Sequence, residues 1–379
     1  MNIVIAIDSL KGSLTSLEAG YAIAEGISKA MPDAITAVRP LADGGEGTVE
    51  ALTLGMGGKL ETAKVTGPYG QPVQAAYGIL PDGTTAVMEM SAAAGIMLTA
   101  PEDKNLLYAT TFGVGEMIRD AIEKGCRKFI VGIGGSATND GGTGMLQALG
   151  FGLLDENRNQ VRQGAIGLKD IQSVSDEAVI PELKECSFKI ACDVTSPLCG
   201  EQGASVVYGP QKGAGPEMVR QLDEWLENYA GLIQAKYEKA DPKFPGSGAD
   251  GGLGFAFLGC LNGVLESGIR IVLEETELED WIRDADVVVT GEGRLDGQTV
   301  MGKAPVGVAA LAQKHGKKVI AFSGSAARDA SVCNEHGIHA FFPILRSAVS
   351  LEEAMDPKTA RENLSAAAEQ VFRLIRAFA

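Results

Sequence analysis

The sequence has few of the features that are typical of zinc-binding, nucleic-acid-binding and membrane proteins. Only three of its 379 residues are histidine, and no two of its six cysteines form a CxxC pair, so a zinc site is not expected. Lysine and arginine form no run in a chain whose formal net charge is −16, which argues against a nucleic-acid partner. No apolar run reaches the ~18 residues that a membrane span requires.

The N-terminal segment and the cysteines indicate the compartment. Residues Met1 to Asp8 are apolar, but they lack the basic region of a secretory signal and are typical of a buried strand. The cysteines are scattered along the chain, as in proteins that keep reduced thiols. We expect a cytoplasmic protein, monomeric or homodimeric, with neither a membrane nor a nucleic acid as its partner.

Two regions of alternating strands and helices flank a middle region with a different pattern. The middle begins with strands at 59–66, 72–80 and 84–90 that are separated by Gly-Pro and Pro-Asp-Gly turns, as in an antiparallel meander. The flanking regions contain five buried strands that we expect to be parallel, at 3–7, 34–38, 286–290, 318–322 and 339–343.

These patterns predict an α/β protein in which a flavodoxin-like, doubly wound parallel sheet is interrupted by an inserted second α/β domain. The first domain is expected to comprise residues 1–60 plus 283–379, and the insertion residues 61–282. Ligand sites favour domain interfaces and the carboxyl ends of parallel strands. We therefore expect an active-site cleft between the two domains.

Glycine is abundant, with 49 residues against a usual share of ~7%, and it clusters in loops. Three of these loops, 8–13, 42–48 and 290–299, follow strands of the same predicted sheet and therefore share one edge. Their basic residues suit a carboxylate or a phosphate, and their acidic residues suit a hydroxyl or a hard cation. Turn, capping and surface roles are the alternatives. The candidates, with Lys303 just beyond, are Asp8, Ser9, Lys11, Asp43, Glu46, Glu292, Arg294, Asp296 and Lys303.

The predicted insertion carries three further loops. Residues 132–142 are a glycine-rich loop that follows a strand and precedes a helix, a pattern that recurs in phosphate sites, although the loop matches neither the Walker A nor the GxGxxG motif. Asp193 follows a strand and is a candidate general base or Mg²⁺ ligand, and Lys212 is a candidate phosphate partner or a surface lysine. The glycines of 246–254 serve either close packing or a second anion site.

These loops resemble, in order and along nearly the whole chain, those of the bacterial glycerate kinase family of the glycerate 2-kinase type. The shared motifs include ADGGEGT at 42–48, GIGGSATNDGG at 132–142 and TGEGRLDGQT at 290–299. The DSxKGS-like segment at 8–13, ACDV-x-x-PL at 191–198 and YGPQKGA at 208–214 complete the set. The chain departs from the pattern at two positions, where Leu10 replaces a usual phenylalanine and Asp250 a usual small residue.

The resemblance implies transfer of the γ-phosphate of ATP to D-glycerate with Mg²⁺, in a two-domain fold that closes over its substrates. It favours 2-phosphoglycerate over 3-phosphoglycerate as the product that accompanies ADP. A non-catalytic sensor of sugar acids or nucleotides is the alternative. A dinucleotide-dependent dehydrogenase is disfavoured because the first strand is not followed by GxGxxG.

We assign hypothetical roles on the principle that phosphoryl transfer needs positioning and charge neutralisation. The catalytic candidates are Asp193 as general base, Lys11 and Arg294. Substrate binding is assigned to Asp8, Ser9, Asp43, Glu46 and Lys303. Nucleotide binding is assigned to Gly134, Gly135, Ser136, Thr138, Asn139 and Lys212, and Mg²⁺ binding to Asp193, Glu292 and Asp296.

Overall fold

The computed structural model describes residues 1–45, 47–100 and 104–378, so Glu46 lies outside the described residues. Contacts divide the chain into two compact units. Unit 1 comprises Met1–Asp43, Glu50–Met56 and Ile269–Ala379, and unit 2 comprises Gly44–Val49 and Gly57–Gly268. Within the described ranges, no helix is both long and apolar enough to cross a membrane.

Unit 1 is built on a five-stranded sheet in the order β13-β12-β11-β1-β2, and every neighbouring pair is parallel. Numbered within the unit, this order is 2-1-3-4-5, which is that of flavodoxin. The predicted flavodoxin-like sheet is therefore confirmed. The strands are β1 (Asn2–Ile5), β2 (Ile35–Val38), β11 (Val287–Leu295), β12 (Lys318–Ala326) and β13 (Ala340–Pro343).

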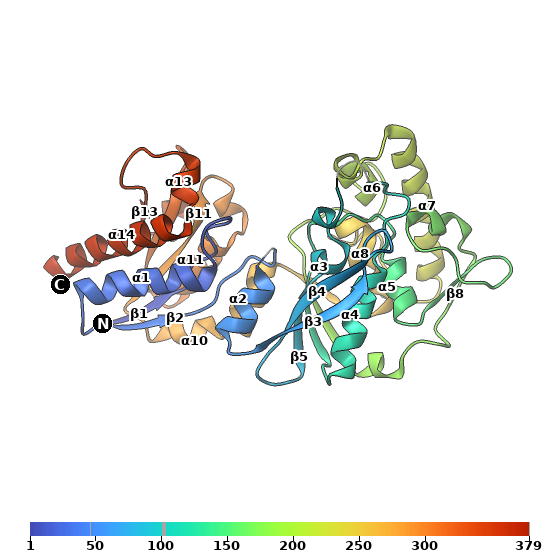
Figure 1. Cartoon of the computed structure of the whole chain (residues 1–379), viewed down its shortest axis with the longest axis horizontal. Helices are drawn as coiled ribbons and strands as arrows, with labels where there is room; N and C mark the ends of the chain where they lie inside the picture. The colour runs from blue at the N-terminus through green and yellow to red at the C-terminus, as the bar shows by residue number, and fades with distance from the viewer. Residues whose placement is uncertain (46, 101–103, 379) are drawn as a thin grey trace. The chain divides into compact units, whose positions relative to one another are not determined.

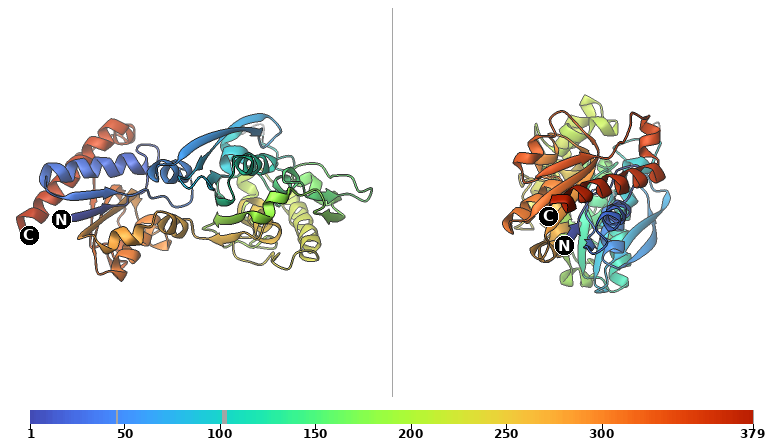
Figure 2. Two further views of the ribbon diagram at one scale, coloured as in Figure 1. Left: turned by 90° about the horizontal axis from the view of Figure 1, so that it is seen from below. Right: turned by 90° about the vertical axis from the view of Figure 1, so that its left-hand side faces the viewer.

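Helices α1 (Ser16–Ala30) and α14 (Pro357–Phe378) run side by side in unit 1 (Figure 1 and Figure 2). A Cβ atom at Gly26 would lie 2.2 Å from the carbonyl oxygen of Ser365, so only glycine permits this close approach. Thr15 is the N-terminal cap of α1 and forms a capping box with Glu18. The other helices are α2 (Thr48–Gly55), which crosses the division, α9 (Gly268–Glu275), α10 (Leu278–Arg283), α11 (Ala304–Lys314), α12 (Val332–Glu335) and α13 (Leu351–Met355).

Unit 2 contains a six-stranded sheet in the order β10-β9-β6-β5-β4-β3. The predicted meander forms its antiparallel part, because β4 pairs antiparallel with both β3 and β5. The remaining pairs are parallel, so the inserted domain is a mixed α/β structure. The strands are β3 (Lys59–Thr66), β4 (Pro72–Ile79), β5 (Thr85–Glu89), β6 (Lys128–Gly132), β9 (Ser187–Ala191) and β10 (Val264–Glu266), with β7 (Gly152–Leu154) and β8 (Ser173–Ser175) in a separate pair.

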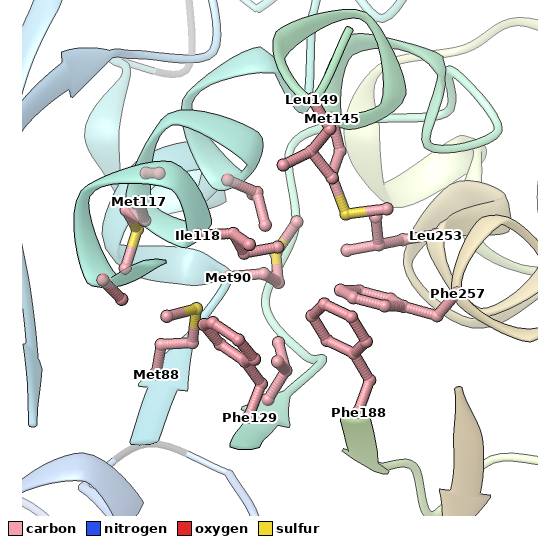
Figure 3. Close-up of a cluster of buried hydrophobic side chains, with 14 of the residues drawn as sticks. Met88, Met90, Met117, Ile118, Phe129, Met145, Leu149, Phe188, Leu253 and Phe257 are labelled. Atoms are coloured by element: carbon pink, nitrogen blue, oxygen red, sulfur yellow. The ribbon is translucent and has the colours of Figure 1, made fainter. Parts of the chain in front are cut away.

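Aromatic and methionine side chains fill the core between this sheet and its helices (Figure 3). Phe129 of β6 stacks on Phe188 of β9 with ring centroids 4.8 Å apart, and Phe257 of helix α8 (Ala249–Cys260) packs against Phe188. This core anchors the carboxyl ends of β6 and β9, from which two of the candidate loops start. The helices of unit 2 are α3 (Ser91–Ala94), α4 (Phe112–Glu123), α5 (Thr143–Ala148), α6 (Ala204–Tyr208), α7 (Pro216–Gln234) and α8 (Ala249–Cys260).

Candidate active site

A cavity of about 420 Å³ opens in unit 1 beside the carboxyl ends of β1, β11 and β12; we call it the unit 1 cavity. The sheet reverses its strand order between β1 and β11, and such a switch point is where open α/β sheets bind ligands. The predicted site residues of unit 1 that the structure describes all line this cavity: Asp8, Ser9, Lys11, Asp43, Glu292, Arg294, Asp296 and Lys303.

Each cation of the cavity lies beside a carboxylate. The Nζ of Lys11 is 3.6 Å from Asp43, and the Nζ of Lys303 is 3.5 Å from Glu292. The Nε of Arg294 is 3.6 Å from Asp296, although the Arg294 side chain is 67% exposed. Ion pairs this long and this accessible contribute little stability, so an anionic ligand can draw the cations away at small cost.

Glu292 is held in place by a neighbouring hydroxyl group. The hydroxyl of Thr299 donates to its Oε1 at 2.7 Å and accepts from the backbone N–H of Asp296 at 3.1 Å. Thr299 thus holds the carboxylate of Glu292 and the backbone of Asp296. Burial raises the pKa of Glu292, while the bond from Thr299 and the charge of Lys303 oppose that rise. A cation that enters the cavity would favour the ionised carboxylate.

Asp8 is buried at the end of the segment that continues β1, and its Oδ1 accepts the backbone N–H of Ser9 at 2.7 Å. Burial raises the pKa of Asp8 to about 7, and the negative charges of Asp43 and Glu292 add to the effect. The bond from Ser9 and the charge of Lys11 oppose it. Asp8 therefore exchanges a proton near neutral pH.

Asp8→Asn is expected to stabilise the folded chain at pH 8 and to change its stability little near pH 4. Because the folded-state pKa of Asp8 lies above its ordinary value of 3.8, the folded chain holds a proton that the unfolded chain has lost between these values. The wild type therefore loses stability as the pH rises from about 4 to about 7. Asparagine removes this loss, which we expect to be ~2–4 kcal/mol at pH 8.

Urea unfolding of both chains at the two pH values measures this difference. Asp33→Asn is a matched control, because Asp33 is an exposed aspartate of the same unit. If Asp8→Asn shifts stability equally at both pH values, or destabilises the chain at pH 8, the pKa of Asp8 is not raised in the folded chain.

The glycine-rich loop of unit 2 follows β6 and has an exposed part and a buried part. Gly134 and Gly135 are exposed, and a Cβ atom at Gly134 would meet nothing within 4 Å, so a ligand can approach the backbone there. Ser136, Thr138 and Asn139 are buried, with at most 3% exposure. Of the predicted nucleotide-binding residues in this loop, only the two glycines thus present an accessible surface.

Asp140, which the sequence reasoning did not single out, accepts hydrogen bonds from backbone N–H groups at the start of helix α5. Its carboxylate accepts the backbone N–H groups of Gly142 at 3.1 Å and Gly144 at 3.3 Å, and that of Thr111 at 2.8 Å. The anion that this helix end attracts is therefore a side chain of the protein itself. The sequence signal was an aspartate three residues before the first residue of the helix, close to the position where N-terminal capping residues are common.

Lys212 lies beneath the same loop and is 4% exposed. Its Nζ donates to the hydroxyl of Ser136 at 2.7 Å and to the carbonyl oxygen of Thr138 at 2.7 Å. Burial lowers the pKa of Lys212 to about 8, while the negative charges of Asp250 and Asp140 oppose this. Lys212 holds the inner side of the loop.

Residues 246–254 pack closely against this loop, which decides between the two alternatives for their glycines. Asp250, Gly251 and Gly252 adopt three consecutive left-handed conformations, and the backbone N–H of Gly141 donates to Gly251 at 2.8 Å. A Cβ atom at Gly251 would lie 2.2 Å from the carbonyl oxygen of Thr138. The buried carboxylate of Asp250 is coupled to Lys212 and Ser136, which lower its pKa against the larger raising effect of burial.

Asp193 is an exposed residue just after β9, and its Oδ1 accepts the backbone N–H of Gly268 at 3.2 Å. It belongs to unit 2, whereas Lys11, Arg294, Glu292 and Asp296 belong to unit 1. The residues proposed for catalysis and for metal binding therefore come from both units. Among the residues that the structure describes, no group of three or more His, Cys, Asp or Glu side chains is arranged to hold a metal ion.

The geometry defines a class first: a flavodoxin-like sheet with a charged cavity at its switch point, suited to a small anionic ligand. The family follows from comparison with known proteins. The model of the glycerate kinase family matches residues 3–376, and the chain belongs to that family.

Relatives support this membership along the whole chain. Glycerate kinase of Haemophilus influenzae is 45% identical over 375 residues, which cover 99% of each chain. Glycerate 2-kinase of Escherichia coli K12 is 45% identical over 371 residues, which cover 98% of this chain and 97% of that one. A crystal structure assigned to glycerate kinase 2 of Salmonella typhimurium LT2 is 44% identical, with a TM-score of 0.93 over 100% of this chain and 99% of that one.

Proposed function

We propose that the chain is an ATP-dependent glycerate kinase that phosphorylates the 2-hydroxyl of D-glycerate, releasing 2-phosphoglycerate and ADP. The observation that carries the proposal is the unit 1 cavity, in which a member of the glycerate kinase family gathers three cations and four carboxylates. The names of the Haemophilus and Escherichia relatives support the substrate and the acceptor position. Release of ADP that depends on glycerate tests it, and its absence would reject it.

Phosphoryl transfer requires that the reacting groups be held in line and that charge on the transferred group be neutralised. Lys11, Arg294 and Lys303 supply this charge in the unit 1 cavity, toward the transferring phosphoryl or the glycerate carboxylate. Asp8, Ser9 and Asp43 offer oxygen atoms for the glycerate hydroxyls, and Glu46 joins them on sequence grounds. Asp193 is proposed to accept the proton of the reacting hydroxyl.

Nucleotide phosphate is proposed to meet the loop Gly134–Asn139 through its exposed backbone at Gly134 and Gly135. The buried residues of this set then support the conformation of the loop without contacting the nucleotide. They are Ser136, Thr138, Asn139 and Lys212. This division of labour follows from their burial, since at most 4% of each of these side chains is exposed.

Mg²⁺ fits the donor set of the unit 1 cavity, because Glu292 and Asp296 provide the hard oxygen ligands that this ion prefers. Magnesium in kinases is held by one or two carboxylates together with substrate phosphates, so a complete protein cage is not required. We propose Glu292 and Asp296 as ligands, with Asp193 as a third. The ion would neutralise charge on the phosphate oxygens when bound.

A cytoplasmic location is proposed for the chain. All six cysteines are free thiols, as is usual for proteins kept in a reducing compartment. ATP as a substrate agrees with that compartment. The oligomeric state is proposed to be a monomer or a homodimer.

A further inference from the structure

The unit 1 cavity contains an apolar wall that none of the roles above uses. Leu351, Ala354 and Met355 of α13 contribute to it, with Ile344 and Leu345 from the segment after β13. Leu351 is 76% exposed and Leu345 is 40% exposed, although both are large aliphatic side chains. Apolar side chains that lie together beside polar groups are typical of ligand-binding grooves.

Helix α13 forms this wall by lying against the first loop of the unit. It packs on α14 (Figure 1). The side-chain oxygen of Ser350 caps its start by accepting the backbone N–H of Glu353. The terminal methyl group of Met355 would lie 2.6 Å from a Cβ atom at Gly12, so Met355 reaches the loop that carries Lys11. The apolar wall and the charged groups thus belong to one continuous cavity.

Of the two substrates in the proposed function, on which this inference rests, only ATP has an apolar part that can pack against this wall. Glycerate is a three-carbon acid whose groups are a carboxylate and hydroxyls, and it gains nothing from Leu351 or Met355. Adenine is a flat aromatic base with apolar faces, and burying such faces is favourable. A cavity of 420 Å³ also lies within the ~300–1,000 Å³ typical of sites for cofactor-sized ligands.

We infer that the adenosine end of ATP binds in unit 1, against Leu351 and Met355, with its phosphates directed toward the cations of the same cavity. Lys11, Arg294 and Lys303 are then partners of the polyphosphate. The position agrees with the tendency of doubly wound sheets to bind nucleotides at their switch point.

Leu351→Asp tests this inference, because the residue is exposed and the substitution places charge on the wall without opening the core. We expect the KM for ATP to rise about tenfold or more, since contacts in apolar pockets are worth about 10–200-fold. The KM for glycerate and the kcat should stay within about twofold. Saturation-transfer NMR should show that adenosine alone binds the wild type and not the variant.

Leu374→Asp is the matched control, since Leu374 is an exposed leucine of α14 that does not line the cavity. Leu351→Ala, a milder change, should raise the KM for ATP less, and thermal melting verifies that each variant is folded. A rise in the KM for glycerate alone would overturn the inference, and so would an unchanged KM for ATP. If adenosine binding depends on Leu351 but the wild type releases no glycerate-dependent ADP, the adenosine site stands and the proposed function fails.

Discussion

Lys212→Met is expected to destabilise unit 2 by ~3–5 kcal/mol, because it removes two buried hydrogen bonds from a charged donor, each of which is worth ~1.5–3 kcal/mol. The substitution leaves the buried carboxylate of Asp250 without its cation and removes the donor to Ser136 Oγ and to the Thr138 carbonyl oxygen. The loop above then loses its support, so the KM for ATP should rise in parallel.

A second substitution separates this mechanism from a simple packing defect. Asp250→Asn removes the stranded charge while keeping a residue type that tolerates the left-handed conformation seen here, with φ of 51°. It should therefore recover part of the stability lost in Lys212→Met, although alone it brings no such gain. Lys239→Met, at an exposed lysine of the same unit, should stay within ~0.5 kcal/mol of the wild type.

The two tryptophans allow unit 2 to be monitored by itself. Trp225 lies in unit 2 and Trp281 in unit 1, so a Trp281→Phe background leaves a single reporter in α7. Urea unfolding followed by the fluorescence of Trp225 then gives the free-energy change for each variant. Equal stability of Lys212→Met and the parent chain would show that Lys212 does not hold the loop.

Asp193→Asn is expected to lower kcat by ~10²–10⁴, the usual contribution of a positioned general base. The amide has nearly the same shape, and its oxygen can still accept the backbone N–H of Gly268. Folding should therefore be unchanged, and the loss should fall on turnover more than on either KM. Steady-state kinetics with both substrates varied measures this separation.

Asp170→Asn, at an exposed aspartate of the same unit, is the control for the Asp193 variant and should retain normal turnover. If Asp193→Asn keeps nearly full turnover, the assignment of the base fails. Should Asp8→Asn abolish turnover in that case, the buried carboxyl with a pKa of about 7 becomes the proton acceptor.

The parts of the fold that local sequence patterns dictate were predictable. Buried apolar runs such as residues 3–7 marked the parallel strands, because both faces of such strands are covered. Loops that follow these strands must share one edge of the sheet, which is why Asp8, Asp43 and Arg294 could be placed in one site. The strands of the meander were also predictable from local sequence, because the turn residues Gly67-Pro68 and Pro81-Asp82-Gly83 separate them clearly.

Contacts between distant segments were beyond the reach of such patterns. Lys212 in a glycine-rich loop suggested an accessible phosphate ligand, but the packing of residues 246–254 against Thr138 buries it. Leu351 and Met355 belong to a short helix without any motif, and only the path of α13 over Gly12 brings them to the cavity. Motifs indicated which residues bear charge, whereas tertiary packing decides which of them a ligand can reach.

The central claim is that this chain transfers phosphate from ATP to glycerate, and a coupled assay of ADP release tests it most directly. We predict ADP release that requires D-glycerate within a panel of C3–C6 sugar acids, and phosphorus NMR of the product should show phosphate on the 2-hydroxyl. Phosphate on the 3-hydroxyl would contradict the acceptor position alone. Tight binding of ATP or glycerate without any glycerate-dependent ADP release would contradict the claim and favour a non-catalytic sensor.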